Sequence, residues 1–210
     1  MILSAPSGGG KTTIAQALRT ARDDVGYSVS ATTRQPREGE EDGVDYFFLT
    51  PEEFQRRIDA NEFMEWARYG SSQYGTLVSE VERILKSGKH VVLDIEVQGA
   101  RAIRERLANV VSIFILPPSA GVLRERLTDR STEHGDTLES RLQHAVDEVA
   151  EAPDFDYIVT NDDRAQAVAE VAGIIDAESQ RPMRLPGMAK TLNELRDALA
   201  EQAQSMRHRS

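Results

Sequence analysis

Apolar and polar positions change their spacing along the chain, and each change marks the end of one expected element. Met1-Ile2-Leu3 is a short apolar run, which predicts a buried strand. Ile14, Ala15, Leu18 and Ala21 recur at helical spacing, and a glycine-bearing segment separates them from that run. The chain is therefore expected to open with a strand, a loop and a helix.

The same alternation returns further along the chain. Continuous apolar or β-branched runs predict strands, and apolar residues three or four apart predict helices. The expected strands are 27–33, 46–49, 63–69, a short one near Tyr74, 90–94, 110–116 and 157–159. The expected helices are 51–60, 77–86, 97–107, 119–129, 137–150 and 164–178. Strands that alternate with helices predict an α/β fold with a parallel, doubly wound sheet.

Residues 32–76 form a small mixed α/β insertion between the core segments 1–31 and 77–179. Within it, Thr50-Pro51-Glu52-Glu53 predicts a helix start, with a Thr cap, Pro at the first helical position and Glu three residues after the cap. Residues 34–45 are charged and contain glycine, so we expect a surface loop there.

The C-terminal segment 180–210 has a different pattern. Proline and glycine interrupt its first part, and Leu192, Leu195 and Leu199 then recur at helical spacing. This predicts a tail helix, which either packs on the domain, frays, or meets a partner.

Composition narrows the function classes. The 210 residues are 40% hydrophobic and 29% charged, an ordinary balance for one domain or a core with a lid. The net charge of −10 argues against a nucleic-acid surface, which needs a basic face. No apolar stretch is long enough to cross a membrane, and the first residues lack a signal-peptide layout. Since there is no cysteine, we expect a cytoplasmic protein without disulfides. The composition is compatible with either a monomer or a homo-oligomer.

The segment Ala5-Pro6-Ser7-Gly8-Gly9-Gly10-Lys11-Thr12 lies between the first strand and the first helix, as a phosphate-binding loop does. Glycine backbone can wrap its amide groups around an anion, and the helix N-terminus adds partial positive charge. Lys11 can reach the outer phosphates of a nucleoside triphosphate, and Thr12 can bind Mg²⁺. Ala5 stands where the usual pattern has Gly, so a plain turn is the alternative.

Two arginines suit a second phosphate. Arg34 and Arg37 lie three residues apart beside hydroxyl side chains, and guanidinium groups bind phosphate oxygens in pairs. Tyr46 and Tyr74 add phenols that can donate to the same phosphate. A solvated loop and half-buried sheet tyrosines are the alternatives.

Glu65 alternates with Met64 and Trp66, which directs it toward a cleft if the segment is a strand. A carboxylate pairs well with guanine, whose N1–H and 2-amino group are adjacent donors. Ser30 and Thr76 can donate hydroxyls to guanine O6. The alternative is a surface glutamate.

Asp94 ends an apolar strand, and ligands of open α/β sheets bind at such strand ends. A carboxylate there can hold Mg²⁺ or its water ligands, and a helix cap is the alternative.

A basic set is formed by Arg124 and Arg126 in one expected helix, Arg130 directly after it, and Arg141 in the next. Arginines in a closing lid can neutralise a phosphoryl group in transfer, whereas most helical arginines are only solvated. The polar segment 131–136 is expected to be the tip of this lid.

Taken together, these segments resemble the guanylate kinase family, and the resemblance covers nearly all of residues 1–179. The segments that carry it are 4–12, 28–37, 43–46, 62–67, 74–76, 93–99 and 159–163.

The resemblance implies a P-loop core of 1–31 and 77–179 with a lid near 126–141, and a GMP-binding region in 32–76. It implies an ATP site of Ser7, Gly8, Gly9, Gly10, Lys11, Thr12, Thr13, Arg130 and Asn161. It implies a GMP site of Ser30, Arg34, Arg37, Tyr46, Glu65, Tyr74, Thr76, Asp94 and Glu96. Catalysis would use Lys11, Arg34, Arg126, Arg130, Arg141 and Asp94, and Thr12 and Asp94 would hold Mg²⁺.

The family pattern is kept with small departures. Thr76 stands where Ser is common, Glu96 replaces a frequent Asp, and Ser131 replaces a Gly. The resulting hypothesis is a kinase that moves the terminal phosphoryl group of ATP to GMP. A related kinase for a phosphorylated ribose and a non-catalytic binding module are the rival interpretations.

Overall fold

The structure of the chain is a computed structural model that describes residues 1–107, 109–129 and 137–207. It divides into two units, Met1–Val171 and Ala172–Ser210, each described here by itself.

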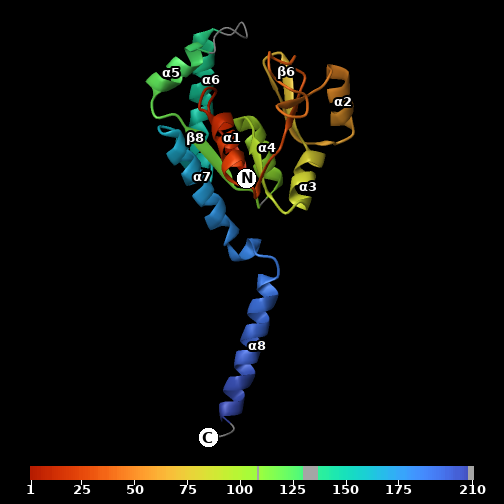
Figure 1. The fold of residues 1–210 in the computed structure, drawn as a ribbon, viewed down its shortest axis with the longest axis vertical. Coiled ribbons are helices and arrows are strands. Elements are labelled where there is room, and N and C mark those ends of the chain that lie inside the picture. Colours follow the sequence, from red (N-terminus) through yellow and green to blue (C-terminus); the bar gives the residue numbers. More distant parts are fainter. Residues whose placement is uncertain (108, 130–136, 208–210) are drawn as a thin grey trace. The chain divides into compact units, whose positions relative to one another are not determined.

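In the described part of the first unit, a parallel sheet of five strands has the order β2-β7-β1-β8-β9. Figure 1 labels β8 of this sheet and several of the helices around it. The chain starts in its middle, since β1 pairs with β7 on one side and with β8 on the other. The register sets Leu3 of β1 opposite Asp94 of β7, so the loop after β1 and the end of β7 share one edge. The strands are β1 Ile2–Ser4, β2 Val25–Tyr27, β7 His90–Asp94, β8 Ser112–Leu116 and β9 Tyr157–Thr160.

Helices cover this sheet, as expected of a doubly wound fold. The apolar core beneath them includes Ile2, Leu93, Ile103 and Phe114, all buried, with the Phe114 and Phe155 rings edge to face at 5.2 Å. The helices are α1 Lys11–Ala21, α3 Val78–Lys86, α4 Val97–Arg106, α5 Ala120–Asp129, α6 Leu138–Ala150, the short 3₁₀ helix Ala152–Asp154 and the start of α7 Arg164–Ser179.

The expectation of one strand over 27–33 is wrong. Val25–Tyr27 pairs with β7 in the parallel sheet, whereas β3, Ser30–Thr32, belongs to a second sheet. Ser28 still donates its backbone N–H to Val92, and the chain crosses to the second sheet after it. The run contains no glycine or proline, so composition did not reveal the change of partner, which is a tertiary effect.

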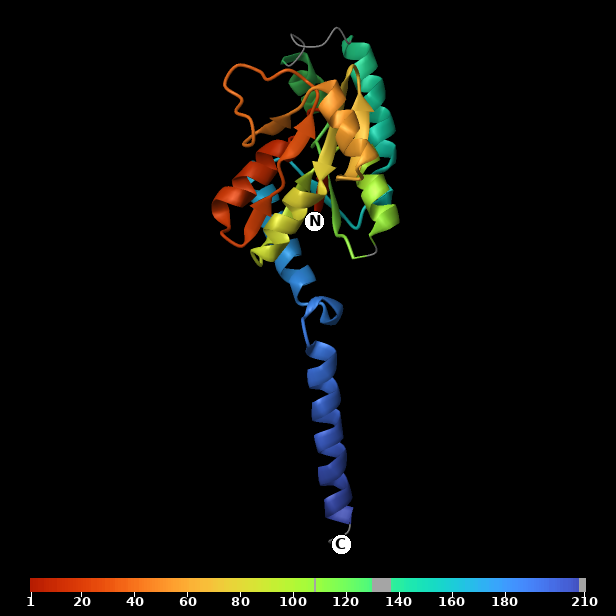
Figure 2. The ribbon, with the colours of Figure 1, turned by 90° about the vertical axis from the view of Figure 1, so that its right-hand side faces the viewer.

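The second sheet has the strand order β4-β3-β6-β5 and is mixed, because β3 pairs parallel with β4 and antiparallel with β6. Its strands are β3, β4 Tyr46–Phe48, β5 Phe63–Tyr69 and β6 Ser72–Leu77. Helix α2, Pro51–Asp59, lies against it (Figure 2). A small apolar cluster joins them, in which the Phe54 and Phe63 rings stack at 4.4 Å beside buried Leu77.

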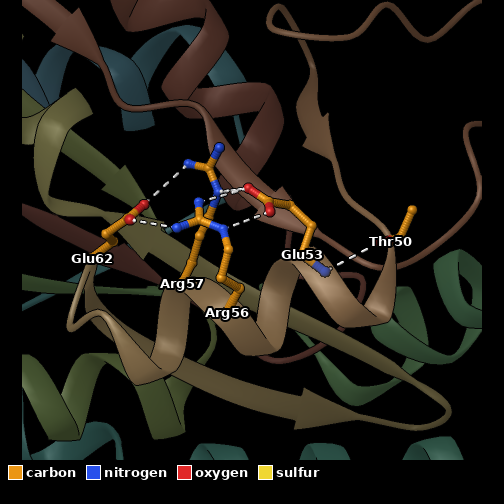
Figure 3. A network of polar contacts seen from close by, with 5 residues as sticks. All are labelled: Thr50, Glu53, Arg56, Arg57 and Glu62. Atoms are coloured by element: carbon orange, nitrogen blue, oxygen red, sulfur yellow. Dashed lines mark hydrogen bonds and ion pairs between the residues drawn. The ribbon is translucent and has the colours of Figure 1, made fainter.

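Helix α2 begins as the sequence predicts. The Thr50 hydroxyl accepts a hydrogen bond from the Glu53 backbone N–H. Glu53 then pairs with Arg56 and Arg57, and both arginines also reach Glu62 ahead of β5 (Figure 3). Exposed pairs of this kind contribute little stability individually, but the network ties the two ends of α2 to the strand that follows.

The second unit contains the end of α7, a 3₁₀ turn at Pro182–Arg184 and α8, Met188–Arg207. The predicted tail helix is therefore confirmed, with Leu192, Leu195 and Leu199 all more than half exposed. In the ranges that the structure describes, none of the helices combines the length and apolarity that a membrane span requires.

Replacing the central ring of the second sheet's core tests this packing. Phe54 is fully buried, so Phe54→Ala should lower the free energy of unfolding by about 3–5 kcal/mol, measured by urea titration. Glu52→Gln, at an exposed position of the same helix, is the matched control and should leave the midpoint nearly unchanged. Equal midpoints for Phe54→Ala and the parent chain would contradict the assignment of this core.

Candidate active site

In the glycine loop between β1 and α1, the glycine positions leave no room for a side chain or have backbone angles that favour glycine. Gly8 and Gly10 have φ angles of 80° and 94°, in the left-handed region that favours glycine. A Cβ atom on Gly9 would lie 2.8 Å from the Ala5 Cβ atom. Gly10 caps α1 without any side-chain hydrogen bond, so the first amide groups of that helix remain available to an anion.

Two side chains from distant segments reach this loop. The Asn161 amide, just after β9, donates to the Gly9 carbonyl at 2.9 Å and is buried. Arg126 of α5 donates to the same carbonyl at 3.5 Å. Asn161 also fills the space beside Gly10, where a Cβ atom would lie 2.4 Å from its nitrogen. The structure thus brings both predicted residues to the loop.

Lys11 is held by two carboxylates from the end of β7 and the start of α4. Its Nζ atom lies 2.7 Å from Glu96 Oε1 and 3.8 Å from Asp94 Oδ1. Burial alone would lower the pKa of Lys11, but the charges of Glu96 and Asp94 outweigh it and raise the pKa above its usual value. The ammonium group is therefore charged and fixed beside the loop.

Asp94 has an unsatisfied oxygen. Its Oδ1 atom is buried and accepts no hydrogen bond from any residue that the structure describes. Burial raises the pKa of Asp94, whereas the Lys11 charge and the nearby Thr12 hydroxyl lower it. A carboxylate oxygen and a hydroxyl are ligands suited to a hard divalent cation. Within the described ranges no group of three or more acidic or histidine side chains could hold a metal, so other ligands would have to complete the shell.

One face of the second sheet carries a row of predicted residues. In the strand register Tyr46 lies opposite Ser30, Ser30 opposite Thr76, and Thr76 opposite Glu65. Because partners across a sheet project to the same side, these four residues share one face. Tyr74, two residues before Thr76, shares it too, and its ring meets that of Tyr46 edge to face at 6.1 Å.

Glu65 is directed inward by an irregularity in β5. The register shifts between Phe63 and Glu65, so that Met64 is an extra residue, as in a β-bulge. Glu65 is only 6% exposed, and its Oε1 atom accepts a hydrogen bond of 2.6 Å from the Thr76 hydroxyl. Burial raises the pKa of Glu65, and the bond from Thr76 opposes that shift.

Arg34 lies at the end of the same row. Its guanidinium group lies 5.4 Å from the Tyr46 ring centre and 5.8 Å from that of Phe48, and its Nη2 atom donates to both carboxylate oxygens of Glu40. Arg37 is exposed, and its backbone N–H donates to the same Glu40 carboxylate.

The row and the glycine loop lie near each other because helix α4 meets both: Glu96 at its start binds Lys11, and its first turn lies against Glu65. Burial raises the pKa of Tyr46 to about 12, with Asp94 adding to the shift and Lys11 opposing it, so the phenol lies within the field of both. Glu65 similarly feels the charge of Glu96, which binds Lys11.

The other predicted residues either bind outside the glycine loop and the row or are exposed. Arg141 of α6 donates to the Leu127 carbonyl of α5, and Arg124 and Thr13 are exposed. Thr12 is exposed too, with its hydroxyl near Asp94. Arg130 and the expected lid tip, 131–136, lie outside the described residues.

Sequence reasoning missed Glu148. This residue of α6 accepts a hydrogen bond of 3.0 Å from the Ser7 backbone N–H in the glycine loop, across 141 positions of sequence. Burial, with the nearby charge of Glu96, raises the pKa of Glu148 to about 7. The only signal for it was its spacing of seven residues from Arg141, which sets both on one side of the helix.

A glycine loop between a central parallel strand and a helix, faced by a polar sheet surface, defines a P-loop nucleotide-binding enzyme of the kinase type. The comparisons with known proteins are more specific. The family model for guanylate kinase matches residues 1–178. The guanylate kinase of Symbiobacterium thermophilum is 45% identical over 88% of this chain and 87% of its own length. That of Thermotoga maritima is also 45% identical, over 87% and 88%.

A solved structure agrees. The crystal structure of guanylate kinase from Anaplasma phagocytophilum has a TM-score of 0.76 with 32% identity, covering 92% of both chains. The chain therefore belongs to the guanylate kinase family, and the predicted resemblance and α/β fold class are confirmed. Enzymes of this family are phosphotransferases between ATP and GMP.

The raised pKa of Glu148 makes stability depend on pH. The folded state holds the proton up to about pH 7, whereas an unfolded glutamate loses it near pH 4.5, so stability should fall as the pH rises between these values. The loss is on the order of 3 kcal/mol. Urea unfolding at pH 5 and pH 8 should show it in the parent chain and a smaller difference in Glu148→Gln. Identical pH dependence in both proteins would contradict the assignment.

Proposed function

We propose that this chain catalyses the reversible, magnesium-dependent transfer of the terminal phosphoryl group of ATP to GMP, giving ADP and GDP. In this step the bond between the β–γ bridging oxygen and the terminal phosphorus breaks, and a phosphate oxygen of GMP forms the new bond. The observation that carries the proposal is that the start of α4 meets both Lys11, through Glu96, and the buried Glu65 carboxylate, so the two assigned side chains lie near each other.

The acceptor needs no catalytic base, because a GMP phosphate oxygen is already ionised at neutral pH. Catalysis then depends on alignment and on neutralising charge. Lys11 is suited to the outer phosphates of ATP, since its ammonium group is charged and fixed beside the glycine loop. We assign the loop residues Ser7 to Thr13 and Asn161 to ATP, with Asn161 supporting the loop through the Gly9 carbonyl.

The second sheet supplies the acceptor site in this proposal. Arg34, Arg37, Tyr46 and Tyr74 would bind the GMP phosphate, which a paired guanidinium fork and phenol donors suit. Glu65 would accept from the N1–H and 2-amino group of guanine, while Ser30 and Thr76 face O6. Thr76 also orients the Glu65 carboxylate through its hydroxyl.

The donor set at Thr12 and Asp94 fits magnesium. Asp94 offers a buried oxygen that accepts no hydrogen bond within the described residues, and the Thr12 hydroxyl lies nearby. Phosphate oxygens and waters would complete the octahedral shell. When bound, Mg²⁺ would neutralise phosphate charge and orient the donor, while Arg126, Arg130 and Arg141 would neutralise the group in transfer.

An acceptor panel tests this function directly. With MgATP as donor, the chain should phosphorylate GMP with a far higher kcat/KM than AMP, IMP or ribose 5-phosphate. A preference for the ribose phosphate would instead identify the related kinase, and absence of transfer to every acceptor would identify a binding module.

The guanine assignment is tested at Glu65. Glu65→Gln should raise the KM for GMP by about tenfold or more and leave the KM for ATP nearly unchanged, because one acceptor for two guanine donors is lost. Glu62→Gln removes a nearby carboxylate that pairs with Arg56 on the surface, and it should change neither constant. An equal rise in both KM values for Glu65→Gln would contradict the assignment.

A further inference from the structure

Gly99 lies in the first turn of α4, directly against the carboxylate that the proposed function assigns to guanine. A Cβ atom on Gly99 would lie 2.7 Å from Glu65 Oε2 and 3.1 Å from its Cδ atom. Since real Cβ atoms essentially never approach another heavy atom within 3.0 Å, the carboxylate occupies space that only glycine leaves free. Gly99 itself has an ordinary backbone, so its conformation alone does not require glycine.

The two oxygens of Glu65 have separate neighbours. Oε1 accepts from the Thr76 hydroxyl at 2.6 Å, and Oε2 is the atom nearest to the open position at Gly99. The carboxylate is thus set between a strand on one side and a helix on the other. Turning it away from α4 would also turn Oε1 away from Thr76, so the two contacts together determine its orientation.

Two opposing effects act on the charge of the Glu65 carboxylate. Glu65 is almost completely buried, which opposes ionisation, and the N-terminal turn of a helix carries partial positive charge that favours an anion. Without a side chain at Gly99, the carboxylate can approach that turn closely. An alanine there would both displace the carboxylate and move it away from the helix terminus.

We propose that Gly99 is a specificity-determining position of this enzyme: it touches no substrate and acts through Glu65, by leaving the space in which that carboxylate is held for guanine. The proposal rests on the proposed function of Glu65. It assigns to α4, an element of the P-loop core, an indirect part in choosing the acceptor base, exerted through Glu65.

The substitution Gly99→Ala suits the test, because the fold should tolerate it. Alanine is a better helix former than glycine, and the atom that must shift is the end of a flexible side chain. Gly121→Ala is the matched control. Gly121 also lies in the first turn of a helix, α5, and a Cβ atom there would meet only Ser119 Oγ, at an ordinary 3.6 Å.

The readout is the ratio of kcat/KM for GMP to that for IMP, which lacks the 2-amino group. This ratio does not depend on the fraction of folded enzyme, since both acceptors are tested on one preparation. Gly99→Ala should lower the ratio on the order of tenfold without changing the KM for ATP, because a misplaced Glu65 carboxylate distinguishes the two bases poorly. Gly121→Ala should keep the parent ratio.

A double variant shows whether Gly99 acts through Glu65. In the Glu65→Gln background the carboxylate that is proposed to recognise guanine is already replaced, so Gly99→Ala should lower the ratio no further. A full additional loss in that background would overturn the proposal, because the methyl group would then act on the substrate directly.

Two further results separate the inference from the function on which it rests. If Glu65→Gln lowers the GMP-to-IMP ratio and Gly99→Ala does not, the role of Gly99 is refuted while the proposed function stands. If Glu65→Gln leaves the ratio unchanged, guanine recognition by Glu65 is refuted, and the role of Gly99 falls with it.

Discussion

The ion pair between Lys11 and Glu96 is the contact around which the site is arranged. Lys11 begins α1 and Glu96 caps α4, and the two meet because β1 and β7 are neighbours in the parallel sheet. At 2.7 Å the pair fixes the ammonium group beside the glycine loop, and Asp94 adds a second carboxylate from the end of β7. Sheet topology thus places the charge that we assign to the outer phosphates of ATP.

Helix α4 extends this arrangement to the acceptor side. Its first turn contains both the cap residue that holds Lys11 and the glycine against which Glu65 lies. The two parts of the proposed site are therefore connected by one helical turn. The register of the second sheet sets Tyr46, Ser30, Thr76 and Glu65 on one face, so pairing of its four strands assembles the proposed acceptor side as a unit.

The sequence predicted the local chemistry well where a motif or a period expresses it. The glycine loop, the Thr50 cap and the alternation of strands and helices are local patterns, and the structure bears each of them out. Prediction from the sequence failed where the structure depends on which distant segment a residue packs against. Ser28 carries no signal that the chain leaves one sheet for another, and nothing near Gly99 indicates that a carboxylate 34 positions earlier needs its space. The contact of Glu148 with Ser7 is likewise visible only after folding.

In the proposed arrangement, the donor and acceptor sites face each other across a single gap. A bisubstrate ligand, adenosine and guanosine joined through five phosphates, tests this arrangement when its affinity is measured by calorimetry. If both sites open on one gap, this ligand should bind one per chain with a Kd at least about 100-fold below those of ATP and GMP, because the second contact becomes intramolecular. Binding no tighter than that of ATP alone would contradict the account.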